Sequence, residues 1–139
     1  MKYWKFVTLL CFPFFGFAQE SNINEQPPVF ESCKEQPFEA IQKCFDIKVF
    51  DLLFKNFIVP ERLVEEGYRG EVIVLFEVEK EGTFRVLYVD AITAELKAEA
   101  IRVFQTFPQI APATYNGIPT YKQYSIKLKI PLGRSNCFD

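Results

Sequence analysis

The chain has 139 residues, enough for one domain with a single hydrophobic core, and its 49% hydrophobic against 24% charged residues exclude a disordered chain. The formal charge is −2, and it falls to about −4 without the first 18 residues, which hold two lysines and no acid. This acidic balance argues against nucleic acid as the main partner.

The first 18 residues have the pattern of an export signal. Lys2 and Lys5 precede an apolar run at residues 6–17, and a small residue, Ala18, follows it. The run is shorter than the roughly 20 residues that cross a bilayer, which makes an uncleaved anchor the less favoured alternative. The sequence therefore predicts a signal peptide at residues 1–18, cleaved after Ala18, and a periplasmic protein.

Composition predicts three parts in the exported chain. Residues 19–28 are polar, end in Pro27 and Pro28 and show no apolar face, so we expect a short extended lead-in, at residues 19–32, outside the fold. Residues 33–132 form the predicted domain. Residues 133–139 are expected to be a frayed polar tail.

Helical spacing marks three segments in chain order. Apolar residues recur every three or four positions over residues 45–57, which predicts an amphipathic helix. Residues 60–66 begin with proline and are followed by Gly67, which predicts a short helical turn. Thr93 is a plausible N-cap for a further helix that ends before Pro108.

Strict alternation predicts three strands. Residues 71–79 and 83–90 alternate and are joined by a tight turn, in which Gly82 is expected to take a positive φ. The last strand is predicted at residues 121–130. Side chains expected on buried faces are Val72, Val74, Phe76 and Val78, then Phe84, Val86 and Tyr88, then Tyr124, Ile126, Leu128 and Ile130. The order helix, strand, strand, helix, strand predicts an α+β domain: a three-stranded antiparallel sheet covered on one face by two helices.

The cysteines predict one disulfide bond. Export places Cys33, Cys44 and Cys137 where disulfides persist, and we favour the pair Cys33 and Cys44 over any pair with Cys137. Cys137 is then free or pairs between chains. Cys11 lies in the leader directly after Leu10. A lipidation signal has a small residue at that position, so lipidation of Cys11 is disfavoured. No metal site is expected, since the chain has no histidine and no Cys-x-x-Cys.

An ordered set of motifs carries a family resemblance. Residues 60–72 are a proline, a short helix, a glycine and a strand entry, residues 76–83 are a hairpin, and residues 108–119 are a loop with three prolines. The set resembles the C-terminal domain of the TonB family over about residues 28–132. Ile110 stands where that family usually has Trp, and Val59 where an aromatic is common.

The resemblance implies a non-enzymatic binding role. Domains of this family add an extended segment of an outer-membrane transporter to a sheet edge in TonB-linked transport, and such an edge offers backbone N–H and C=O groups. The candidate edge comprises Tyr121, Gln123, Tyr124, Ser125, Ile126, Lys127, Leu128 and Lys129. Alternatively, Lys127 and Lys129 only protect the edge against aggregation. Residues 19–28 reach at most about 35 Å, so an accessory or adaptor role fits better than transmission of force across the periplasm.

Two other classes of function remain as alternatives. A structural component of the envelope would form a homodimer through the same edge. An enzyme is disfavoured, because without histidine no Ser-His-Asp or Cys-His site exists. The carboxylate pairs Glu65 and Glu66, Glu77 and Glu79, and Glu95 and Glu99 are expected on solvated faces. We expect no cofactor, no small-molecule substrate and no nucleic acid. The expected partner is a TonB-dependent transporter or another envelope protein.

Overall fold

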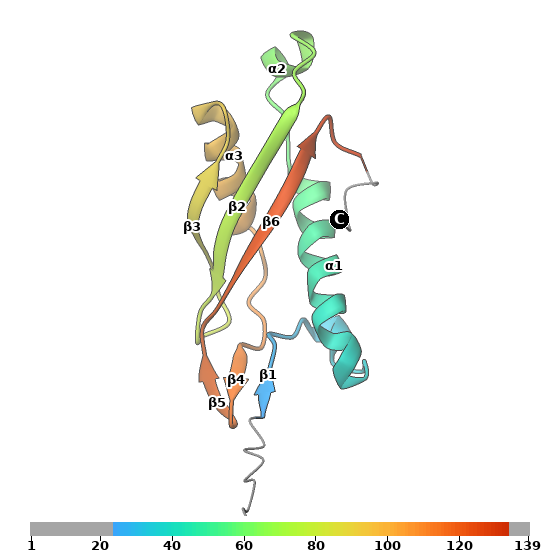
Figure 1. Ribbon diagram of the computed structural model, residues 1–139, viewed down its shortest axis with the longest axis vertical. Helices are drawn as coiled ribbons and strands as arrows, with labels where there is room; N and C mark the ends of the chain where they lie inside the picture. Colours follow the sequence, from blue (N-terminus) through green and yellow to red (C-terminus); the bar gives the residue numbers. More distant parts are fainter. Residues whose placement is uncertain (1–23, 134–139) are drawn as a thin grey trace, which may run out of the picture.

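The main sheet has three antiparallel strands in the order β3, β2, β6 (Figure 1). In the computed structural model, which describes residues 24–133, the central strand is β2 (Gly70–Val78), flanked by β3 (Phe84–Asp90) and β6 (Lys122–Ile130). The predicted inward residues of β2 are all buried: Val72, Val74, Phe76 and Val78. The alternation of residues along this strand therefore predicted its buried face correctly.

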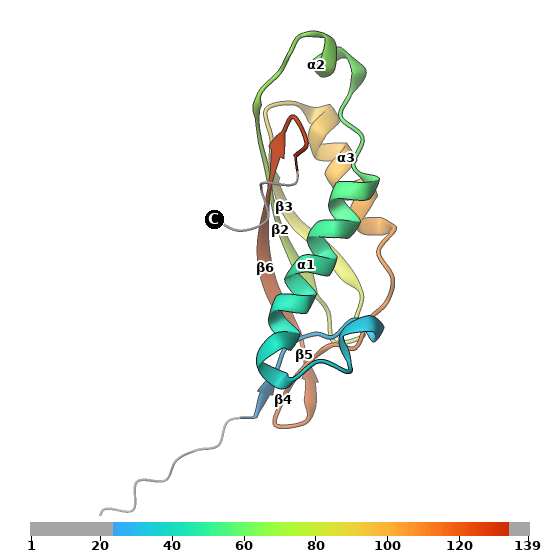
Figure 2. The ribbon, with the colours of Figure 1, turned by 90° about the vertical axis from the view of Figure 1, so that its right-hand side faces the viewer.

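Two long helices cover one face of this sheet, as Figure 2 shows. They are α1 (Phe38–Asn56) and α3 (Ala94–Gln105). Between α1 and β2 lies the short α2 (Glu61–Glu65), followed by Gly67 at φ 64°. Thr93 caps α3 as predicted, since its hydroxyl oxygen accepts a hydrogen bond from the Leu96 N–H at 3.2 Å. The predicted α+β class is confirmed.

The first helix is longer than predicted. The apolar spacing predicted residues 45–57, whereas α1 begins at Phe38, directly after Pro37. The first turns of α1, which the prediction missed, show little amphipathic pattern. Phe38 is apolar but 56% exposed, and Glu39 and Ala40 do not mark a buried face. Proline before the first helical residue was the signal for this start.

One face assignment in β3 is wrong. We expected Tyr88 on the buried face with Phe84 and Val86, but Tyr88 is 59% exposed and Val89 is 6% exposed. The register against β2 shifts here, because Leu75 pairs with Tyr88 while Phe76 pairs with Val86. Leu87 is thus an extra residue, a β-bulge, which reverses the alternation after it.

A second small sheet was not predicted. It has the order β1, β4, β5, with β1 (Glu25–Gln26), β4 (Ala113–Tyr115) and β5 (Ile118–Thr120). Asn116 and Gly117, with φ of 49° and 80°, form the turn between β4 and β5. The loop predicted at residues 108–119 is therefore partly a hairpin, for which an Asn-Gly pair between short β-prone runs is the usual signal.

The lead-in belongs to the fold in its described part. Pro27 and Pro28 are buried, Phe30 is 5% exposed, and Val29 pairs with Ala111 as an isolated bridge. The expectation that residues 19–32 lie outside the fold is therefore wrong from Asn24 onward. The strand pairing of Glu25 and Gln26 with β4 explains the difference, because it is a long-range contact that local composition does not report.

An aromatic cluster fills the space between the sheet and the two helices. Phe45 of α1 lies 4.7 Å from Tyr124 of β6, and Phe76 of β2 lies 4.8 Å from Phe104 of α3, between ring centroids. The cluster joins both helices to all three strands. It is the packing that positions β6 relative to α1.

The turn between β2 and β3 requires glycine. Gly82 has φ 83°, as predicted, and a methyl group on it would collide with the carbonyl oxygen of Ile110. The Ile110 N–H donates to the Gly82 carbonyl at 3.0 Å. Ile110, one of the two departures from the family pattern, is thus a core residue held against this turn.

Several predictions concern residues outside the described range. These are the signal peptide at residues 1–18, the state of Cys137 and nearly all of the tail, residues 133–139. Within residues 24–133, no helix combines the length and the apolar character that crossing a membrane requires.

Candidate functional site

The predicted binding edge is an outer strand of the main sheet. β6 pairs with β2 over nine residues without a register shift, from Lys122 opposite Val78 to Ile130 opposite Gly70. Within residues 24–133, no other strand pairs with β6. One side of β6 is therefore open to a further strand.

The hydrogen bonds of the hairpin turn define which groups of β6 face outward. The Glu79 N–H donates to the Thr83 carbonyl at 2.9 Å, so odd-numbered residues of β2 direct their backbone groups toward β3. Even-numbered residues of β2 then face β6, because backbone groups alternate along a strand. Through the regular register, Gln123, Ser125 and Lys127 direct their N–H and C=O groups away from β2.

Three of the eight predicted edge residues direct their side chains toward the core. Leu128 is 1% exposed, Ile126 is half-buried, and Tyr124 packs on Phe45. The Tyr124 hydroxyl donates to the Gln42 side-chain oxygen of α1 at 3.3 Å, and burial raises the pKa of Tyr124. These residues pack against the core and hold the strand in place.

The other predicted edge residues lie on the face away from the helices. Gln123, Ser125 and Lys127 are exposed, Lys129 is half-buried, and Tyr121 just before β6 is 56% exposed. The Lys127 ammonium group lies 3.5 Å from a Glu71 carboxylate oxygen across the sheet. The structure thus places seven of the eight predicted edge residues on β6, and Tyr121 directly before it.

A buried carboxylate ties both outer strands to the centre. Glu77 of β2 is 6% exposed, accepts a hydrogen bond from Arg85 of β3 at 2.7 Å and another from Gln123 of β6 at 3.2 Å. Both bonds hold the pKa of Glu77 below its ordinary value, and the bond from Arg85 has the larger effect. The prediction that Glu77 lies on a solvated face is wrong.

Four of the five other carboxylates named as acid/base candidates form ion pairs, all except the exposed Glu65. Glu66 and Glu95 both bind Arg62, at 3.0 and 3.4 Å, and Glu99 binds Arg102 at 2.6 Å. The Arg102 bond lowers the pKa of Glu99, and the bond from the Ile58 N–H lowers it further. None of these carboxylates lines the pocket described below. Residues 24–133 contain no cluster of side chains suited to a metal ion.

The predicted disulfide is present. Cys33 of the short helix η1 (Glu31–Cys33) is bonded to Cys44 of α1, and their Cα atoms are 6.0 Å apart. Cys44 lies within α1 and not before it, so the bond joins two helices. It fixes the start of α1 beside Phe30 and Phe45 of the core.

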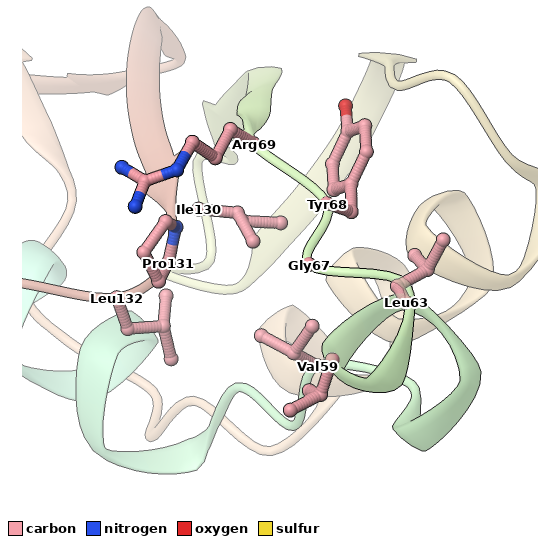
Figure 3. A pocket seen from close by; sticks show the side chains of 9 residues that line it. Val59, Leu63, Gly67, Tyr68, Arg69, Ile130, Pro131 and Leu132 are labelled. Atoms are coloured by element: carbon pink, nitrogen blue, oxygen red, sulfur yellow. The ribbon is translucent and has the colours of Figure 1, made fainter.

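A pocket of about 300 Å³ lies at the end of β6 and was not predicted (Figure 3). Its walls come from the α1–α2 connection, from α2 with the segment after it, and from the end of β6 and the two residues that follow. The lining residues are Val59, Leu63, Val64, Gly67, Tyr68, Arg69, Ile130, Pro131 and Leu132. No local pattern could have revealed it, because the two contributing stretches are far apart in sequence.

Comparisons with known proteins returned no match: neither a family model, nor a curated protein, nor a solved structure aligns significantly with this chain. The resemblance to the TonB family therefore rests on the motifs of the sequence. What the chain does is argued below from its own edge strand and pocket.

Proposed function

We propose that this protein is a non-enzymatic binding module of the cell envelope that takes up an extended partner segment along β6. The observation that carries the proposal is the regular nine-residue outer strand with one unpaired side among residues 24–133. Such a strand supplies a ladder of main-chain hydrogen bonds to an incoming segment. In keeping with the resemblance, the proposed partner is a TonB-dependent transporter of the outer membrane or another envelope protein.

The side-chain environment of the edge supports this role. Gln123, Ser125 and Lys127 direct their backbone N–H and C=O groups away from β2 and have exposed polar side chains. The inward residues of β6 pack on the core and hold the strand in place. A partner segment therefore meets a rigid strand and need not order it first, which lowers the entropic cost of binding. Five of the six carboxylates considered for acid/base chemistry are engaged with arginines, which supports a binding role over an enzymatic one.

Capture from envelope extracts tests the proposal. Ser125→Pro removes one outward N–H and leaves the pairing with β2, whereas Ser125→Ala keeps that N–H and changes only the side chain. Immobilised wild type and Ser125→Ala should retain outer-membrane transporters, and Ser125→Pro should lose them. Equal recovery by all three would contradict edge addition.

Self-association is the competing outcome. A protein that captures no membrane partner, and that forms a dimer abolished by Ser125→Pro, would be a structural component pairing through its own β6 edges. Sedimentation of wild type and Ser125→Pro over a range of concentrations distinguishes the two. Turnover of a small substrate that is lost on replacing one glutamate would overturn the non-enzymatic assignment.

A further inference from the structure

The pocket at the end of β6 has a mostly apolar wall with one cation, Arg69, at its rim. Leu63 is 3% exposed and Ile130 is 5% exposed, so the inner wall is part of the core surface. In Figure 3, Arg69 extends toward Pro131 at the end of β6, and Tyr68 points away on the other side. A volume of about 300 Å³ lies at the lower end of the range for specific binding pockets.

Arg69 is distinguished from the other described arginines by its lack of a carboxylate. Arg62, Arg85 and Arg102 each bind one or two glutamates at 3.4 Å or less. Within residues 24–133, no carboxylate lies within ion-pair distance of Arg69, which is exposed. A guanidinium group beside an apolar pocket suits a ligand that carries a carboxylate next to an apolar group.

The pocket is continuous with the proposed edge. Ile130 is both the last residue of β6 and part of the pocket wall, and Pro131 and Leu132 extend that wall directly. A segment paired along β6 is therefore led to the mouth of the pocket. The outward positions Gln123, Ser125 and Lys127 include no acid that would repel a carboxylate carried by the segment.

We propose that the pocket and Arg69 form an anchoring subsite for the partner segment. A large apolar side chain of the segment enters the pocket, and a carboxylate adjacent to it in the segment binds the Arg69 guanidinium. The inference rests on the proposed function, because the edge delivers the segment to the pocket. Backbone pairing along β6 does not depend on the sequence of the partner segment. The subsite adds such a dependence, because it requires an apolar residue beside an acid.

Synthetic peptides test the subsite. The probe alternates Thr and Val over the length of β6, has a Lys at its distal end for solubility, and carries Phe-Asp at its N-terminal end. That end meets the C-terminal end of β6 when the strands pair antiparallel. Matched probes carry Phe-Asn or Ala-Asp instead. Fluorescence anisotropy measures the affinity of each probe for the intact protein.

The expected result is a discrimination that depends on Arg69. Wild type should bind the Phe-Asp probe about tenfold more tightly than the Phe-Asn probe, since a charge-assisted hydrogen bond is lost. Wild type should also bind the Ala-Asp probe about tenfold more weakly than the Phe-Asp probe, because alanine leaves the pocket unfilled. Arg69→Gln should bind the Asp and Asn probes equally, and the control Lys97→Gln, an exposed cation on α3, should discriminate as wild type does.

Other outcomes separate the subsite from the edge. If wild type binds all three probes equally and Ser125→Pro binds none, the subsite is wrong and the edge function stands. If Ser125→Pro binds the probes as wild type does, or if no probe binds at millimolar concentration, edge addition fails and the subsite fails with it. If octanoate binds in an Arg69-dependent manner while the probes do not discriminate, the pocket serves a small carboxylate and the peptide assignment is overturned.

Discussion

The two outer strands of the main sheet differ in the regularity of their backbones. β6 pairs with β2 over nine residues with no shift, whereas β3 contains the bulge at Leu87 within its seven residues. A bulge bends a strand and interrupts the spacing of its outward N–H and C=O groups, which protects an edge against further pairing. β6 keeps an even ladder and has polar or charged side chains on its exposed face. The comparison teaches that one sheet can carry a protected edge and a receptive one.

The largest effect is expected from proline within β6. Ile126→Pro removes an N–H that faces β2 and a half-buried side chain, so it should lower the free energy of unfolding by at least about 3 kcal/mol. Ser125→Pro removes an outward N–H and should cost about 1 kcal/mol or less. Urea unfolding followed by circular dichroism measures both. Similar losses for the two variants would show that the outward side of β6 is not open.

Glu77 couples the two edges, and its removal is expected to have an intermediate effect. Glu77→Gln weakens the bonds from Arg85 and Gln123 and should cost about 1 to 2 kcal/mol at neutral pH. Because the folded state lowers the pKa of Glu77, its stabilisation is complete above the ordinary glutamate pKa and is lost as pH falls through the lowered value.

The pH dependence of unfolding checks this assignment. The wild-type free energy of unfolding should decline below about pH 4.3, and Glu77→Gln should show a shallower decline. Glu35→Gln, an exposed glutamate outside the sheet, should keep the wild-type slope. An unchanged slope in Glu77→Gln would mean that another carboxylate, such as Glu99 beside Arg102, dominates the acid response.

Deleting Leu87 would convert the protected edge into a regular one. The pairs Leu75 with Tyr88 and Phe76 with Val86 already exist on either side of the bulge, so the shortened strand can keep them with unbroken alternation. The deletion should cost about 1 kcal/mol through the lost half-buried side chain and should raise concentration-dependent association. Sedimentation measures the association. A deletion variant that stays as monomeric as wild type would show that features other than the bulge protect β3.

The smallest effect is expected from the charge on the receptive edge. Lys127→Gln removes a partly exposed ion pair with Glu71 and should change the free energy of unfolding by no more than about 0.5 kcal/mol. Its effect should instead be slower association with the Phe-Asp peptide, because the loss of Lys127 leaves Glu71 without its cation and weakens the attraction for the Asp of the peptide. Lys80→Gln, in the turn at the β3 side, is the control and should associate at the wild-type rate. Stopped-flow fluorescence measures these rates; equal rates for both variants would contradict a role for Lys127.

Much of the candidate edge could be predicted because its signals are local. The outward and inward residues of β6 followed from alternation alone, and Ser125 and Lys127 are exposed as that pattern required. The pocket could not be predicted, since it forms only where residues near Leu63 meet Ile130. Arg69 gave no signal either, because its distance from every carboxylate of residues 24–133 is a property of the folded chain.

The sequence by itself determined the inward faces of β2 and β6, the Thr93 cap, the glycine in the β2–β3 turn and the favoured disulfide between Cys33 and Cys44. Each follows from the preferences of neighbouring residues. Only the tertiary structure decided the strand order that leaves β6 outermost, the bulge that turns Tyr88 outward, and the joining of β1 to β4. These features arise from pairings between distant segments, whose energies depend on how the core closes.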